Sequence, residues 1–195
     1  MSVVQRMEGQ GAVRSGDLLV SRRLLAAAPV MAFAAAAAHL AWEASHGGIR
    51  SHHLLNRADL PSVSNSWGLL VLPVLGWLAA YFVRRRATAS ARAPSRALAA
   101  FFGSLVVALA LSAAFRLELS NVTAGLFFAV LLSGVALRTY RAEYLFGFVL
   151  GMTFVFGSVL PTMAAMVTGS VSVLAHFVAY PVVAALYKRV RGPSS

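Results

Sequence analysis

The chain has 195 residues, of which 59% are hydrophobic and 12% are charged, whereas soluble domains are about 45–50% apolar and about 25% charged. A water-soluble core of this size cannot bury so much apolar surface, so the composition excludes an ordinary soluble domain and indicates a membrane protein. The net charge of +11 does not indicate a nucleic-acid partner, because the basic residues form short clusters between uncharged apolar runs, as they do beside membrane spans.

The N-terminal region combines a polar segment with the first apolar run. Residues 1–20 are rich in glycine and polar side chains, and we expect them to be a disordered cytoplasmic segment. The apolar run Leu24–Trp42 predicts the first membrane span. Its preceding arginines, Arg22 and Arg23, also fit a cleavable signal sequence, whose removal would leave five spans, but the run is longer than a usual signal core. We expect the pair Gly47-Gly48 to end this helix.

Six apolar stretches are long enough to cross a bilayer. A spanning helix needs ~20 mostly apolar residues, and one charge at its centre costs about 2.5–3.5 kcal/mol. No Asp, Glu, Lys or Arg interrupts the stretches Leu24–Trp42, Trp67–Val83, Ala97–Phe115, Asn121–Leu137, Tyr144–Val167 and Val171–Tyr187. The sequence therefore predicts an all-α, polytopic membrane protein, a bundle of six transmembrane helices within residues 21–191, followed by a short cytoplasmic tail at 192–195.

The distribution of basic residues predicts the orientation. If the N-terminus is cytoplasmic, the outer segments hold only Arg50, Arg57 and Arg116. The inner segments hold the other basic residues, which are Arg6, Arg14, Arg22, Arg23, Arg84, Arg85, Arg86, Arg92, Arg96, Arg138, Arg141, Lys188, Arg189 and Arg191. This asymmetry predicts that both termini are cytoplasmic, and the wealth of Arg and Ala favours a bacterial inner membrane.

The same clusters predict the partners. We expect the basic cytoplasmic segments to contact anionic lipid head groups of the bilayer, and we expect no nucleic acid. A homo-oligomer or another membrane protein remains open as a partner. Within the spans, Gly147-x3-Gly151 and the run Ala34–Ala38 are small-residue patterns that let two helices approach closely.

Histidines and one glutamate are the side chains most capable of chemistry. His39, Glu43 and His46 are spaced i, i+4 and i+7, so they share one stripe of the first helix. The following loop adds His52 and His53. We expect His176 to lie near the outer end of the last span, which would bring all five histidines to one face of the membrane.

This pattern suggests a metal or haem site. Imidazoles and a carboxylate are ligands of Zn²⁺, and a metal-bound water with Glu43 as general base would hydrolyse a substrate at the outer face. Alternatively, His39 and His176 would ligate a haem iron from two helices. The predicted metal ligands are His39, Glu43, His46, His52, His53 and His176. The competing interpretation is that these histidines lie at the interface and bind backbone carbonyls.

Two other functional classes remain open, so the sequence does not establish whether the protein is an enzyme. Val71-Leu72-Pro73 is echoed by Val159-Leu160-Pro161 in a corresponding place of the second half, and inverted repeats with proline-broken helices are typical of transporters. A small-solute permease is therefore one alternative, although ordinary proline-containing membrane helices also explain this echo. A non-catalytic assembly subunit of a larger membrane complex is the other alternative, because such a subunit needs no polar site of its own.

Overall fold

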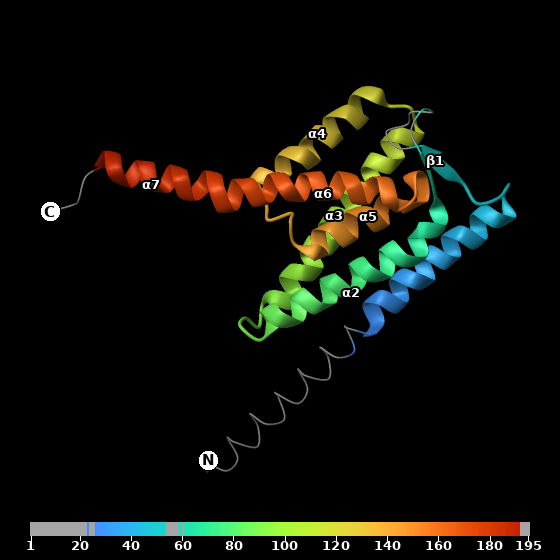
Figure 1. Ribbon diagram of the computed structural model, residues 1–195, viewed down its shortest axis with the longest axis horizontal. Coiled ribbons are helices and arrows are strands. Elements are labelled where there is room, and N and C mark those ends of the chain that lie inside the picture. Colours follow the sequence, from blue (N-terminus) through green and yellow to red (C-terminus); the bar gives the residue numbers. More distant parts are fainter. Residues whose placement is uncertain (1–22, 24–25, 54–58, 60, 192–195) are drawn as a thin grey trace, which may run out of the picture.

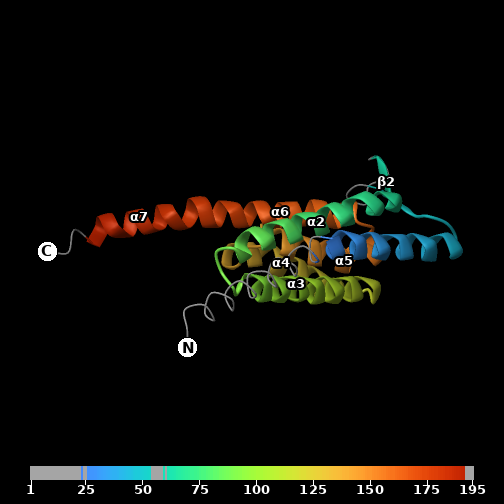
Figure 2. The same cartoon turned by 90° about the horizontal axis from the view of Figure 1, so that it is seen from below.

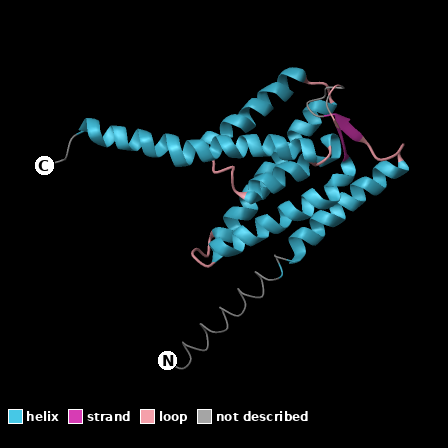
Figure 3. Ribbon diagram, in the orientation of Figure 1, coloured by secondary structure: helices cyan, strands magenta, loops and turns pink. Residues whose placement is uncertain are grey.

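A computed structural model describes residue 23, residues 26–53, residue 59 and residues 61–191. The segments 1–20 and 192–195, expected to be a disordered N-terminus and a tail, lie outside the described residues. The described chain folds as a bundle of helices with a small two-stranded sheet at one end (Figures 1 and 3). The all-helical class expected from the sequence is therefore confirmed.

The first helix covers residues 26–45, and it ends where expected, because Gly47 and Gly48 adopt φ angles of 110° and 100° that favour glycine. The chain then forms β1 (Ser51–His53), which pairs antiparallel with β2 (Ser62–Ser64), and a turn of 3-10 helix, η2 (Asn65–Trp67). The remaining elements are α2 (Gly68–Ala87), α3 (Ala93–Arg116), α4 (Ser120–Ala136), α5 (Ala142–Phe156), α6 (Val159–Leu174), the π-helical turn η3 (Ala175–Ala179) and α7 (Tyr180–Arg191).

The connections gather at two ends of the bundle. One end, which we call the basic end, carries the α2–α3 and α4–α5 turns and the arginines Arg84, Arg85, Arg86, Arg92, Arg96, Arg138 and Arg141. The other, the hairpin end, carries the β1–β2 sheet and the α3–α4 and α5–α6 turns. Contacts between Arg86 and Glu143 at the basic end, and between Asn65 and Gly157 at the hairpin end, show which turns lie together.

Three of the helices are long and apolar enough to cross a membrane: Asn65–Ala87, Ala93–Arg116 and Val159–Tyr187. The apolar helices Ser120–Ala136 and Ala142–Phe156 are shorter; at 1.5 Å per residue they extend about 25 Å and about 22 Å, against a hydrocarbon core of ~30 Å. The structure thus has the helices of a membrane protein, whereas six transmembrane helices are not confirmed.

The boundary predicted between the last two spans is wrong. The expected span Tyr144–Val167 is broken after Phe156, where Gly157 has a φ of 68°. Pro161 explains the break, since a proline ring clashes with the carbonyl four residues earlier, here that of Gly157. Pro73, by contrast, lies inside the unbroken α2, so the two proline motifs do not form equivalent structures.

The turn expected between Val167 and Val171 does not exist. Residues 159–191 form one continuous helical segment of α6, η3 and α7, and α7 extends the line of α6 beyond the bundle (Figures 1 and 2). Gly169 is a contact point rather than a helix end, because its Cα faces Tyr140 and Leu145 across the helix interface, as small residues do in membrane helices.

Helix α5 is the centre of the bundle and packs against α2, α3 and α6. The small-residue pattern at Gly147 and Gly151 has the role that the sequence predicted. A Cβ added at Gly147 would collide with the Phe101 carbonyl and the Ser104 hydroxyl, and one at Gly151 would lie 2.7 Å from the Ala108 Cβ. These two glycines therefore let α5 and α3 pack with their backbones close together.

The first helix packs along α2 through small residues as well. Ala32 and Ala36 are buried, and Ala36 is the only member of the run Ala34–Ala38 with so little exposure. A Cβ at Gly76 would lie 3.0 Å from the Ala28 carbonyl oxygen. This antiparallel contact places the C-terminal end of the first helix, with Glu43, beside the start of α2.

Candidate functional site

Glu43 is a buried carboxylate at the hairpin end, with 3% of its surface exposed. Its Oε1 accepts a hydrogen bond from the Asn65 side-chain amide at 2.6 Å, and its Oε2 accepts one from the Arg50 backbone N–H at 3.2 Å. Of these two residues, Arg50 directly precedes β1 and Asn65 directly follows β2. Glu43 therefore ties this sheet to the first helix.

His39 lies one turn before Glu43 and is also buried. Its Nε2 is 3.6 Å from the Glu43 Oε1, which is too far for a hydrogen bond, and this nitrogen has no hydrogen-bond partner within the described chain. The ring packs edge-on against Phe154 of α5, with centroids 4.8 Å apart. Of the predicted site residues, His39 and Glu43 are the pair that the structure brings together.

None of the three other histidines at this end completes a metal-binding group with this pair in the described part of the chain. His46 is exposed, stacks on Trp42 at 4.7 Å between centroids, and lies 2.8 Å from the Trp42 carbonyl through Nδ1. His52 and His53 belong to β1, opposite Val63 and Ser62 of β2. For His46, the interpretation of an interfacial histidine bound to a backbone carbonyl agrees with the structure.

His176 lies at the basic end rather than beside His39, so the expectation that it shares a depth with His39 is wrong. Its Nδ1 is 2.9 Å from the Ser172 carbonyl, and its ring contacts Tyr140 and Tyr180 edge-on at 6.1 and 5.2 Å. The displacement follows from the shifted helix boundary, because α6 begins at Val159 and reaches the α4–α5 turn before residue 176.

The predicted metal or haem site is therefore incomplete. No three His, Asp or Glu side chains of the described residues come together in a metal-binding arrangement, and a catalytic zinc site needs three protein ligands. The two histidines proposed for haem lie at opposite ends of the bundle. Both oxygens of Glu43, the expected general base, already accept hydrogen bonds.

Two further buried polar residues at the hairpin end were not predicted from the sequence. Asn65 is buried between Glu43 and the α5–α6 turn, where a Cβ at Gly157 would collide with its Oδ1. Ser158 is 1% exposed, and its hydroxyl has no partner in the described part of the chain. The sequence signal that could have located these residues was Gly157 followed by Pro161. Such a pair predicts a turn when the surrounding apolar run is long enough for two helices.

The structure contains a cavity at the basic end that was not predicted from the sequence. It has a volume of ≈ 700 Å³ and lies between α3, α4 and α5, with α6 at its floor. Helix α4 leaves this space because it packs on α3 and α6 but buries only Gly134. Most lining side chains are apolar, and the hydroxyls of Ser104 and Ser133 donate to carbonyls of their own helices.

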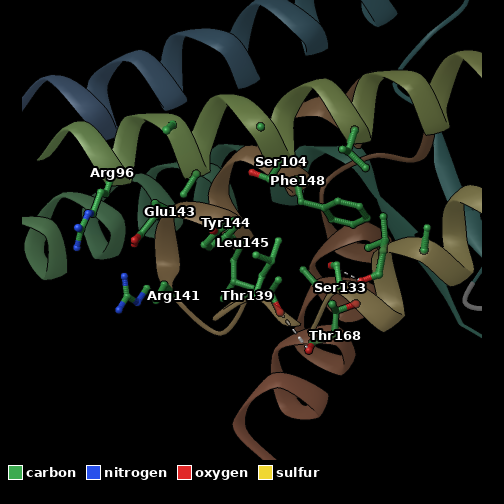
Figure 4. Close-up of a pocket in the computed structure, with 18 of the residues that line it drawn as sticks. Arg96, Ser104, Ser133, Thr139, Arg141, Glu143, Tyr144, Leu145, Phe148 and Thr168 are labelled. Atoms are coloured by element: carbon green, nitrogen blue, oxygen red, sulfur yellow. Dashed lines mark hydrogen bonds between the residues drawn. The ribbon is translucent and has the colours of Figure 1, made fainter. Parts of the chain in front are cut away.

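The mouth of the cavity is cationic. Arg96 of α3 and Arg141 before α5 line it together with Glu143, and Figure 4 shows these three side chains at one end of the cavity. The Glu143 carboxylate is neutralised by Arg86, whose guanidinium donates two hydrogen bonds to it at 2.7 and 2.6 Å. Arg96 and Arg141 are left as the net charge of the mouth, and arginine side chains bind anionic groups through paired N–H donors.

No protein-family model, no curated protein and no solved structure matches this chain. The functional assignment therefore rests on the geometry of the two ends of the bundle.

Proposed function

We propose that this protein is a multi-pass membrane protein that binds an anionic phospholipid in the cavity at its basic end. The observation that supports the proposal is the combination of an apolar interior of ≈ 700 Å³ with a mouth formed by Arg96 and Arg141. An acyl chain fits the interior, and a phosphate fits the mouth, since arginine binds phosphate oxygens through paired N–H donors.

The head group decides the selectivity of such a site. An acyl chain gains little when it moves from the bilayer into the cavity, because both surroundings are apolar. Each basic residue near an anionic head group contributes about 1 kcal/mol, so the two arginines together favour an anionic lipid by roughly 2 kcal/mol. The bidentate contact of Arg86 with Glu143 matters here, because an unpaired carboxylate would repel the phosphate.

We further propose that the protein resides in a bacterial inner membrane with its basic end and both termini in the cytoplasm. The arginine-rich turns support this orientation. The chain lacks cysteine, so single Ser90→Cys and Ser66→Cys variants test it. An impermeant thiol reagent is expected to label Ser66→Cys in intact cells and Ser90→Cys only after lysis, and the reverse pattern would refute the orientation.

Metal-dependent hydrolysis and haem binding have less support than lipid binding, because His39 and Glu43 lack further ligands among the described residues. The permease and assembly-subunit alternatives have no specific contact in their favour. Lipid binding is the function supported both by the volume of the cavity and by the positive charge of its mouth.

The test is lipid retention by purified protein carrying Arg96→Ala and Arg141→Ala together. Native mass spectrometry in the presence of phosphatidylglycerol and phosphatidylcholine measures the bound fraction of each. We expect wild-type protein to prefer phosphatidylglycerol. In the double variant, the ratio of phosphatidylglycerol affinity to phosphatidylcholine affinity is expected to fall roughly 30-fold, the equivalent of about 2 kcal/mol.

The matched control is Arg84→Ala with Arg85→Ala, which removes the same charge from the same end without touching the cavity lining. This control is expected to retain the preference. Equal binding of both lipids by wild-type protein, or an equal loss in the control, would refute the proposal.

A further inference from the structure

A second cavity lies between the same helices at the hairpin end. It has a volume of ≈ 1030 Å³, and its wall is formed by aromatic and aliphatic side chains of α3, α4, α5 and α6, among them Phe115, Phe127 and Met152. Its rim carries Arg116 and Glu118 from the α3–α4 turn. The cavity shares no lining residue with the one at the basic end, so it is a separate site.

The rim presents two opposite charges that do not neutralise each other. No hydrogen bond or ion pair joins the side chains of Arg116 and Glu118 to each other or to any other described residue. Glu118 adopts a φ of 58°, a conformation that non-glycine residues seldom adopt. Both side chains are exposed, so a cation and an anion are available at the same opening.

We infer that this cavity binds a zwitterionic phospholipid with a primary ammonium head group. The phosphate contacts Arg116 and the ammonium donates to Glu118, while the acyl chains lie along the apolar wall. An anionic lipid fits less well because Glu118 repels an uncompensated negative charge. A quaternary ammonium fits less well because it has no N–H to donate.

The experiment measures competition at this site in the full-length chain. A photoactivatable phosphatidylethanolamine with its reactive group near the glycerol is bound to protein in detergent, and the crosslinked peptides are mapped by mass spectrometry. Crosslinks are expected within residues 115–128. Unlabelled phosphatidylethanolamine is expected to displace the probe about fivefold better than phosphatidylcholine or phosphatidylglycerol, the advantage of one exposed ion pair.

Two variants separate the contacts. Glu118→Gln is expected to abolish the preference over phosphatidylcholine, and Arg116→Gln is expected to weaken the binding of all phospholipids alike. The Arg96→Ala and Arg141→Ala pair is the control, because it alters the other cavity and is expected to leave these crosslinks unchanged.

Three outcomes would overturn the inference: crosslinks spread over the whole apolar surface, equal displacement by all three lipids, or unchanged selectivity in Glu118→Gln. Each of these leaves the anionic lipid site at the basic end standing, because that site is scored by phosphatidylglycerol preference and by a different pair of arginines. Absence of a phosphatidylglycerol preference in wild-type protein, with intact crosslinks at residues 115–128, would instead refute the proposed function alone.

Discussion

Single polar residues inside this bundle mainly connect neighbouring elements through hydrogen bonds. Glu43 is the clearest case, because its two oxygens connect the first helix to Arg50, which directly precedes β1, and to Asn65, which directly follows β2. Asn65 in turn occupies the space beside Gly157. One carboxylate thus links the first helix, the sheet and the α5–α6 turn.

Replacing Glu43 by alanine is expected to destabilise the protein by about 1–3 kcal/mol, because the Asn65 amide would stay buried without an acceptor. Thermal unfolding in detergent measures the change. Glu43→Gln is the matched control; it keeps one acceptor oxygen and is expected to lose less stability. If Glu43→Ala unfolded at the wild-type temperature, the stabilising role of this carboxylate would be disproved.

At this scale the sequence predicted the pairing of His39 with Glu43 from their i, i+4 spacing, and it failed for His176. The reason is physical. Spacing within one helix is determined by helix geometry, whereas the relation of His39 to His176 depends on where two apolar helices begin and end. His46, His52 and His53 were placed correctly near the hairpin end but lie outside the buried pair.

Helices of this protein are positioned by glycine and proline as much as by apolar length. Hydropathy identified the apolar stretches but could not divide residues 142–191 correctly, because both sides of each possible break are apolar. The signal that decides is local: Gly157 and Pro161 break the helix, whereas Gly169 packs inside it. A glycine in a membrane helix marks either a turn or a contact, and sequence alone does not distinguish the two.

The contact of α5 with α3 gives an element-scale prediction. Gly147→Ala places a methyl group against the Phe101 carbonyl and the Ser104 hydroxyl, so the helices must separate, at an expected cost of about 1–3 kcal/mol. Gly103→Ala is the control, because a Cβ there meets nothing within 4 Å. Thermal unfolding in detergent is expected to show a lower midpoint for Gly147→Ala alone, and equal midpoints would contradict the close packing.

The whole molecule is a bundle with chemically different ends. The basic end has arginines around an apolar cavity. The hairpin end has the buried Glu43 carboxylate with its hydrogen-bond partners, and a second cavity whose rim carries both a positive and a negative side chain. Both cavities follow from one property of the fold: α4 packs on α3 and α6 without filling the space in front of α5. The sequence predicted anionic lipid partners at the basic segments, but not these cavities, because they arise from helix packing.

The proposed function requires that an anionic lipid occupies the basic-end cavity. The most direct test is to identify the lipid that remains on wild-type protein after purification from the membrane. We expect about one tightly held phospholipid in this cavity, with a larger anionic fraction than the bulk membrane lipid. This enrichment is expected to disappear in the Arg96→Ala and Arg141→Ala double variant. Retained lipid with the composition of the bulk membrane, in wild type and double variant alike, would contradict the proposed function.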